Sequence, residues 1–464
     1  MKQRLFWIIS AVMMAVLAFN LPGSMAQRDD DYSFVRTLVD IHRLVATNYV
    51  DPVNEDKLRQ GAIDGMLGQL DPFSIYIPPV HQEEFDNLLE GSFKGVGIQL
   101  DQTPDHHTVV VTPIDDSPAF HAGIMAGDII EKVNGESIDN LRLDEVIKKI
   151  SGPIGSKVTL TVKHVTGKEQ TVTMTRQEVN VPEVVGYERN PDNSWNYWVS
   201  DHPKVAYMQI KQFTPNVSDK VHQTLQSLSS QGMEGLILDL RFNPGGLLEE
   251  AAKIINSFIP PDKVIVSTKG RNRPEHIEYS DDKDKLPQFP LIVLINEHSA
   301  SASEIVSGSL LDNKRALVIG QRSYGKGSVQ EVMPLEDKSG ELKLTVAYYY
   351  LPSGRLVHRK PGATDWGVDP QIVVPVDAQG EEAILNEMYE RELFHRPTTT
   401  PSKPTTTVAT TTTQPTDPQL QQAITTMVGL IVLQNEKSNT TARVEHPVAQ
   451  SVHELTTAPT TQSQ

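Results

Sequence analysis

The strongest constraint on the fold lies between residues 205 and 374, where short apolar segments alternate with amphipathic ones. The apolar segments are continuous, as expected for strands that are buried on both faces of a sheet. The segments between them have the spacing of amphipathic helices. This alternation predicts a layered α/β core. The predicted strands are Val205–Ile210, Leu236–Leu240, Leu291–Ile295 and Leu317–Ile319, and the predicted helices are Val217–Leu228, Leu247–Phe258 and Ala302–Leu311.

Two regions of different character precede this core. Apolar positions at helical spacing over 31–70 predict a helical N-terminal region, which we assign to residues 27–90. From 91 to 178 the sequence changes to short β-branched runs with two short helical segments, a pattern typical of a small, partly open β-barrel. The α/β core is therefore expected over 179–396.

Both ends of the chain have biased compositions. Residues 1–26 combine Lys2 and Arg4 with an apolar run and a small-x-small motif, as in an export signal that is either cleaved or kept as a membrane anchor. Residues 397–418 are rich in Thr and Pro and predict a linker. Residues 419–464 predict a C-terminal helix with a disordered tail. We therefore expect a bacterial periplasmic or envelope protein, attached to the inner membrane if the signal is not cleaved.

Charge and cysteine content exclude several classes of function. The formal net charge of −17 argues against a nucleic-acid binder, which needs a basic face. The chain has no cysteine, so it has no disulfides, no thiolate metal sites and no cysteine nucleophile. Any catalytic nucleophile must come from another residue type.

Three loops at the ends of predicted strands carry the candidate chemistry. Gly245 and Gly246 precede a helix and can direct backbone N–H groups into a cleft. In the next loop three serines alternate with alanines; Ser301 followed by Glu304 also fits a helix capping box. The third loop, 320–330, carries Lys326 between two glycines.

Two other interpretations of these loops stay open. Residues Gly320 to Lys326 satisfy most of a Walker A motif, which suggests an NTPase. Against it, Gly327 occupies the place of the magnesium-binding Ser or Thr, and an exported protein meets no ATP pool. His298, in the serine loop, allows a histidine-based triad.

A serine–lysine pair explains the three loops together. A serine needs a base to become a nucleophile, and a lysine amine can act as that base when burial lowers its pKa. No carboxylate flanks Lys326 in the sequence to hold the charge. Gln330 offers a neutral amide that would orient the amine without raising its pKa. We therefore favour an acyl-transfer site in which the Gly-Gly turn supplies the oxyanion hole.

The loops resemble those of the carboxyl-terminal processing peptidases, which are serine proteases with a Ser-Lys dyad and an inserted PDZ domain. The matching stretches are Leu70–Tyr76, Gly95–Ile98, Asp239–Gly246, Ser299–Glu304 and Tyr324–Gln330. The resemblance implies a core of crotonase-like ββα units, with no metal or nucleotide cofactor. It also implies Ser301 as nucleophile, Lys326 as general base, Gln330 as the residue that orients the lysine, and the N–H groups of Gly246 and Ala302 as oxyanion donors.

The resemblance also suggests the substrate class. The segment Gly95-Val96-Gly97-Ile98 is similar to the carboxylate-binding loop of PDZ domains, which captures the C-terminus of a peptide. The implied substrates are unstructured C-terminal tails of envelope proteins. Arg176 matches an arginine that couples the PDZ domain to the catalytic core. Phe73 departs from the family pattern, which commonly has histidine there.

The sequence says less about the oligomeric state and protein partners of the chain. The helical N- and C-terminal segments have no obvious core of their own, which suggests a homodimer or higher homo-oligomer. An adaptor protein is compatible with the sequence but has no signature in it. The alternative from another class is a non-catalytic PDZ scaffold that binds C-terminal peptides without cutting them.

Overall fold

The computed structural model describes residues 33, 35–103, 106–114, 116–125, 127–139, 141–164, 167–393 and 417–444. The chain divides into two compact units, residues 1–76 and 77–464. The predicted signal segment, 1–26, and most of the predicted linker lie outside the described residues. Within the described ranges, no helix combines the length and the hydrophobicity needed to cross a membrane.

The first unit is helical, as predicted. Residues 35–48 form one helix and α2 (Glu55–Leu67) forms the next. The α2 helix begins after Asn54, whose side chain accepts a hydrogen bond from the Lys57 N–H. Two acidic residues in the first turn interact favourably with the positive end of the helix dipole. The short strand β1 (Ile75–Ile77) lies at the boundary between the units.

A small β domain follows α3 (Pro79–Glu90) in the second unit. Its antiparallel sheet has the order β3-β4-β5-β7-β8, and β2 pairs with β9 where the chain enters and leaves the domain. Buried apolar residues from the sheet and α5 form a separate core. The elements are β2 (Ser92–Gly95), β3 (Ile98–Gln102), β4 (Thr108–Pro113), α4 (Pro118–His121), β5 (Ile129–Val133), β6 (Glu136–Ser137), α5 (Leu143–Ile150), β7 (Lys157–Lys163), β8 (Glu169–Thr175) and β9 (Gln177–Asn180).

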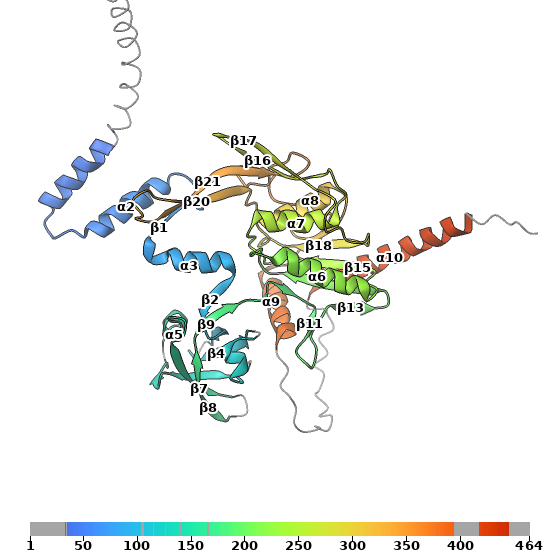
Figure 1. Cartoon of the computed structure of the whole chain (residues 1–464), viewed down its shortest axis with the longest axis horizontal. Helices are drawn as coiled ribbons and strands as arrows, with labels where there is room; N and C mark the ends of the chain where they lie inside the picture. Colours follow the sequence, from blue (N-terminus) through green and yellow to red (C-terminus); the bar gives the residue numbers. More distant parts are fainter. Residues whose placement is uncertain are drawn as a thin grey trace, which may run out of the picture. The chain divides into compact units, whose positions relative to one another are not determined.

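The α/β core contains the predicted buried sheet, so the predicted fold class is confirmed (Figure 1). The sheet has the order β10-β14-β15-β18-β19-β22, with β14, β15, β18 and β19 parallel, and β13 pairs with β14. Its strands are β10 (Val184–Val185), β13 (Trp198–Asp201), β14 (Lys204–Ile210), β15 (Gly235–Asp239), β18 (Leu291–Ile295), β19 (Leu317–Gly320) and β22 (Ile372–Val373).

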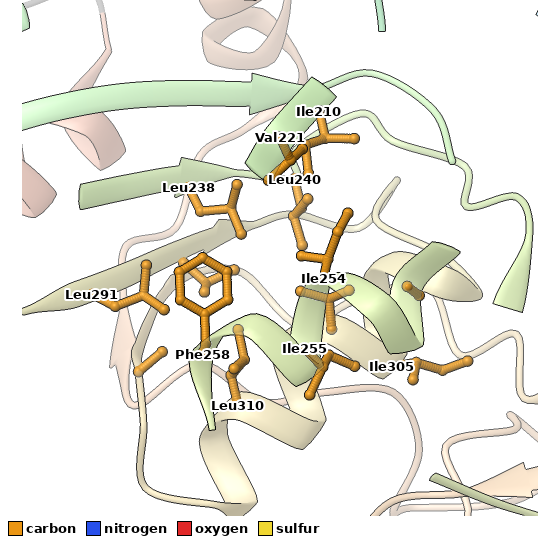
Figure 2. Packing of buried hydrophobic residues seen from close by; sticks show 14 of the residues in the cluster. Ile210, Val221, Leu238, Leu240, Ile254, Ile255, Phe258, Leu291, Ile305 and Leu310 are labelled. Atoms are coloured by element: carbon orange, nitrogen blue, oxygen red, sulfur yellow. The ribbon is translucent and has the colours of Figure 1, made fainter. Parts of the chain in front are cut away.

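Helices cover both faces of this sheet. The helices α6 (Val217–Ser230), α7 (Leu248–Phe258) and α8 (Ala302–Asp312) pack on one face. Leu238 and Leu240 point into this layer together with Phe258 of α7 (Figure 2). Ile237 belongs to the layer on the opposite face. Burial on both faces is why these strands are apolar at every position.

The C-terminal helix α10 (Pro418–Val444) covers that opposite face. Its buried residues Leu420, Ala423, Met427 and Ile431 recur at helical spacing and pack on the core sheet. The C-terminal segment therefore packs on the core of the sheet, from which the linker separates it in sequence.

A second, antiparallel sheet was not predicted. In it β20 pairs with β21, which pairs with β16, which pairs with β17. Its strands are β16 (Val264–Gly270), β17 (Arg273–Tyr279), β20 (Ser328–Pro334) and β21 (Glu341–Tyr350). Every residue of β17 is exposed, so the strand lacks the apolar signal that reveals a buried one. The remaining elements are the pair β11 (Glu188–Arg189) and β12 (Trp195–Asn196) and the helix α9 (Ala378–Glu392).

Candidate active site

The three loops singled out in the sequence meet at one edge of the core sheet. They follow β15, β18 and β19, which are parallel neighbours in the sheet. In register, Asp239 is opposite Leu294 and Ile295 is opposite Gly320. Carboxyl ends of parallel neighbouring strands lie at one edge, so their loops surround one site.

The three serines of the second loop differ in what their hydroxyls do. Ser299 donates to the Leu240 carbonyl (2.8 Å) and Ser303 donates to the Asn243 carbonyl (3.0 Å), and both are fully buried. Ser301 is half-buried at the start of α8, and its hydroxyl donates to no protein acceptor among the described residues. Its φ of +54° is rare for a residue with a side chain and indicates local strain.

A buried carboxylate joins the serine loop to the lysine loop. Oε2 of Glu304 accepts the N–H groups of both Ser301 (2.8 Å) and Lys326 (2.8 Å). Oε1 accepts the hydroxyl of Ser323 (2.6 Å) and the N–H of Gly325 (2.7 Å). Glu304 is fully buried, and burial raises its pKa. The capping box expected from the sequence is present, but the same carboxylate also holds the second loop.

Tyr349 of β21 joins the two loops a second time. Its hydroxyl donates to the carbonyls of Ser301 (3.1 Å) and Lys326. Burial and the nearby Glu304 raise the pKa of Tyr349 well above its usual value, so the hydroxyl stays a donor. Sequence reasoning missed this residue because it lies 48 positions from Ser301 in a run of three tyrosines.

The glycines beside Lys326 allow the lysine loop to pack closely. Gly325 has a φ of +91°, and a Cβ there would lie 2.9 Å from Arg359 Cβ. A Cβ on Gly327 would lie 2.5 Å from the backbone nitrogen of His358. The loop is thus packed closely against the segment that contains His358 and Arg359.

The surroundings of Lys326 lower the pKa of its amine. Burial is the main cause and the charge of Lys343 is the second, whereas Glu304 acts in the opposite direction. No carboxylate flanks Lys326 in the sequence, but in the fold the Glu304 carboxylate lies close to it. Glu304 lies 22 positions earlier in the chain, which is why the flanking sequence did not reveal it.

Gln330 lies on β20 close to this loop. Its amide donates to the hydroxyls of Ser328 (2.9 Å) and Thr345 (3.1 Å). Thr345 is its cross-strand neighbour on β21. The role of Gln330 in orienting Lys326 stays a prediction.

The two glycines of the first loop have different surroundings. The Gly245 N–H donates to the side chain of Asn243 (2.8 Å), and a Cβ on Gly245 would lie 2.7 Å from Ser301 Cβ. Gly246 is exposed with a φ of +142°. Among the described residues, the N–H groups of Gly246 and Ala302 donate to no protein acceptor. They are available to an oxyanion, and the Gly245 N–H is not.

A buried ion network anchors the first loop. Arg241 is fully buried and forms ion pairs with Asp239 (2.7 Å) and Asp417 (2.8 Å). Its guanidinium also donates to Gln419 (3.2 Å), whose amide donates to Gln321 (2.9 Å) in the lysine loop. The first turn of α10 thereby contacts two of the three site loops.

The structure disfavours both alternative interpretations of the loops. The chain continues from Lys326 into strand β20, whereas a Walker A lysine is followed by a helix. The described contacts of His298 are the Phe242 ring, 5.5 Å between centroids, and the carboxylates of Glu297 and Glu381. No hydrogen bond between described residues joins His298 to Ser301.

A metal-compatible cluster lies on the rim of this region. In the described part of the chain, Glu297, His298 and Glu381 are the group whose ligand atoms lie within 4.8 Å of one another. The first two side chains are exposed, and such surface clusters are common without an ion.

The predicted carboxylate-binding loop lies between β2 and β3. The carbonyl of Val96 accepts the Ala119 N–H (2.9 Å) and that of Gly97 accepts the Ile114 N–H (2.9 Å). The N–H groups of Val96 and Gly97 donate to no acceptor in the described ranges. Gly97 has a φ of +75°, and a Cβ there would lie 2.2 Å from Ser117 Cβ, so glycine is required.

Arg176 makes its hydrogen bonds inside the small β domain. Its guanidinium donates to the carbonyls of Ile150 (2.6 Å), Lys157 (3.0 Å) and Lys149 (3.2 Å), and to the Ser156 hydroxyl (3.0 Å). These bonds tie the end of α5 to β7. A role for Arg176 in coupling the domain to the core stays a prediction.

Comparisons with known proteins agree with this architecture. The model of peptidase family S41 matches residues 204–374, that of the PDZ domain matches 109–164, and that of the activating protease CtpB N-terminal domain matches 19–79. A carboxy-terminal-processing protease of Bartonella bacilliformis is 34% identical over 401 residues, covering 83% of this chain and 87% of that protein. The chain belongs to peptidase family S41.

Two further similarities complete the comparison. A probable CtpA-like serine protease of Staphylococcus aureus is 33% identical over 346 residues, covering 74% of this chain and 65% of that protein. A photosystem II D1 C-terminal processing protease superposes with a TM-score of 0.42 and 28% identity over 71% of this chain and 86% of that chain. This S41 peptidase is a serine-type processing protease with a PDZ domain.

Proposed function

We propose that this S41 peptidase is an exported endopeptidase that cuts C-terminal tails with Ser301 as nucleophile and Lys326 as general base. The observation that carries the proposal is the shared acceptor: one oxygen of Glu304 accepts the backbone N–H groups of both residues. Two residues from separate loops are thus held at one point. The nucleophile is the one serine of its loop whose hydroxyl is not donated to a neighbouring carbonyl.

Acylation begins when the Ser301 Oγ attacks the scissile carbonyl carbon. Lys326 in its neutral form, which its lowered pKa favours, takes the hydroxyl proton as the C–O bond forms. The carbonyl oxygen becomes an oxyanion, and the N–H groups of Gly246 and Ala302 stabilise it. The C–N bond then breaks, and the protonated Lys326 gives its proton to the leaving amine. The product is an ester on Ser301.

Deacylation repeats these steps with water. The neutral Lys326 takes a proton from the attacking water, and the same two N–H groups stabilise the second oxyanion. Collapse of this intermediate breaks the ester bond, and the proton on Lys326 returns to the Ser301 Oγ. The residues that hold the dyad, Glu304 and Tyr349, take no part in proton transfer.

The PDZ domain would select the substrate by its terminus. The free N–H groups of Val96 and Gly97 suit a terminal carboxylate, and the peptide would add as a strand beside β3. We infer that the substrates are unstructured tails of envelope proteins. The exposed apolar residues of the N-terminal helix support a homodimer formed through that helix. They are Val35, Leu38, Val39, Ile41 and Leu44.

The test is cleavage of a peptide library with free C-termini, read by mass spectrometry. Ser301→Ala and Lys326→Ala should each abolish cleavage and leave the melting temperature within a few degrees of wild type. Ser299→Ala is the matched control, because that hydroxyl is structural, and it should keep cleaving. Amidated peptides should lose binding to the PDZ domain. Binding by the wild type without any product would instead support a non-catalytic scaffold, and surviving cleavage by Ser301→Ala would refute the dyad.

A further inference from the structure

A groove of about 740 Å³ runs along the outer face of α7, beyond the loops described above. One wall is α7 and the other is the β16–β17 hairpin with the segment that follows it. Its floor includes Ile265 and Val266, both buried. The polar lining residues are Asp219, Glu249, Lys253, Asn256, Thr268, His276, Glu278, Asp281, Lys283 and Asp284.

One lining residue of the groove is close in sequence to the oxyanion loop. Leu248 lines one end of it and lies two residues after Gly246 in the chain. The α7 residues that line it extend from Leu248 to Asn256, which corresponds to about 12 Å along the helix. An extended peptide covers that length with about four residues. A substrate chain that continued from the oxyanion loop along α7 would therefore lie in this groove.

The lining of the groove is negatively charged. Five carboxylates face two lysines, and both lysines are paired: Lys253 with Glu250 (2.7 Å) and Lys283 with Asp281 (3.8 Å). The carboxylates that line the groove therefore outnumber the lysines that line it. Three of these carboxylates, all exposed, form no ion pair among the described residues, namely Asp219, Glu249 and Asp284.

The carboxylates near Lys253 affect the pKa of its amine. The hydrogen bond and charge of Glu250 raise the pKa of Lys253, and Asp219 and Glu249 add to that effect. The far wall is also fixed in place. Asn256 donates to the Asp281 carboxylate (2.8 Å) and to the Lys283 carbonyl (3.1 Å), and it accepts the Asp281 N–H (2.9 Å). The groove is therefore formed before any ligand arrives.

We propose that this groove binds a lysine- or arginine-bearing segment of the substrate next to the scissile bond. The aliphatic stems of these side chains fit the apolar floor, and their charged ends reach the unpaired carboxylates. The occupant is the substrate chain itself, because the lining is acidic and includes Leu248, two residues after Gly246 of the oxyanion loop. This inference rests on the proposed function and adds a preference for basic residues to it.

The test compares two peptides that share one cleavage sequence and one C-terminus. One carries Lys at positions two to four residues from the scissile bond, on the side that the groove holds, and the other carries Gln; both sides are tried. Wild-type enzyme should cleave the basic peptide with a kcat/KM about fivefold higher, as two or three exposed ion pairs provide. The variant Asp219→Asn/Glu249→Gln/Asp284→Asn should lose this preference and keep its activity on the Gln peptide.

The control variant is Glu234→Gln, which removes an exposed carboxylate just before β15, at the end of that strand opposite the site loops. It should keep the preference. Salt at 0.5 M should reduce the preference in the wild type, because ion pairs at this surface are screened. Equal cleavage of both peptides by the wild type, or an unchanged preference in the triple variant, overturns the inference. Cleavage of neither peptide would instead contradict the proposed function.

Discussion

Replacing Glu304 with Gln tests the central geometric feature of the site. The carboxylate accepts four hydrogen bonds, two at each oxygen, from residues of both loops. An amide keeps one oxygen and replaces the other with an NH₂ group. If that group faces the Oε2 side, the N–H groups of Ser301 and Lys326 both lose their acceptor. If the NH₂ group faces the Oε1 side, the Gly325 N–H loses its acceptor.

The magnitude follows from these lost bonds. Each buried N–H left without an acceptor costs about 1–3 kcal/mol. One to two such groups weaken the hold on the two loops by about 1–6 kcal/mol. If this loss of free energy lowers the fraction of enzyme in which Ser301 and Lys326 are aligned, kcat falls by at least about fivefold. The fold itself should persist, since the core layers do not depend on this residue.

The substitution should also move the pH dependence of the reaction. In the proposed mechanism Lys326 must be neutral to accept the serine proton, so we expect activity to rise as pH passes through its pKa. The ionised Glu304 raises that pKa, and its removal should lower it. The acid limb of kcat/KM against pH therefore moves to lower pH in Glu304→Gln.

The assay measures kcat/KM of a quenched-fluorescence peptide from pH 5 to pH 10, with circular dichroism to verify folding. The matched control is Glu234→Gln, an exposed site at the far end of β15. A folded Glu304→Gln enzyme with wild-type kcat and an unmoved acid limb would refute the assignment of Glu304 as the residue that positions the dyad. A lower kcat with an unmoved acid limb would support the positioning role of the Glu304 hydrogen bonds. It would contradict the proposed effect of the Glu304 charge on the pKa of Lys326.

Three further substitutions have defined outcomes. Lys343→Gln should move the same acid limb to higher pH, because the charge of Lys343 lowers the pKa of Lys326; a shift to lower pH would contradict this. Gly245→Ala puts a Cβ 2.7 Å from Ser301 Cβ and should reduce kcat at least tenfold, whereas Gly429→Ala, with open space around its Cβ, should not. Asp417→Ala leaves Arg241 buried with one carboxylate partner and should lower the free energy of unfolding by about 3–5 kcal/mol, measured by urea denaturation; a change below about 1 kcal/mol would show that the pair is not coupled to stability.

The sequence predicted the core sheet well because burial on both faces leaves a strong signal. The predicted strand Leu291–Ile295 matches β18. The predictions for β14 and β19 differ from the structure by one residue at one end, and the prediction for β15 is displaced by one residue at both ends. The second sheet gave no such signal. Residues of β17 are all exposed, and those of β21 are half-buried along most of the strand, so neither shows a continuous apolar run or a clean alternation.

The site was predictable only as far as local motifs reach. Ser301 and Lys326 stand in distinctive loops, so their chemistry could be proposed from residue types alone. Glu304 appeared only as a capping residue, since nothing in the sequence says that a loop 19–22 positions later shares its carboxylate. Asp417 and Arg241 pair across 176 residues, a contact that only the folded sheet and the C-terminal helix create.

Glu304 has two opposing effects on the site: it holds the two loops together, and its charge raises the pKa of Lys326. A carboxylate is the acceptor best suited to hold both N–H groups at one oxygen, yet its charge favours the protonated, inactive form of Lys326. Burial of the amine and the charge of Lys343 act in the opposite direction, and the pKa of Lys326 falls. Alignment and basicity are therefore controlled by different residues. Opposite pH shifts in Glu304→Gln and Lys343→Gln follow from this division, and the double variant should lie between them.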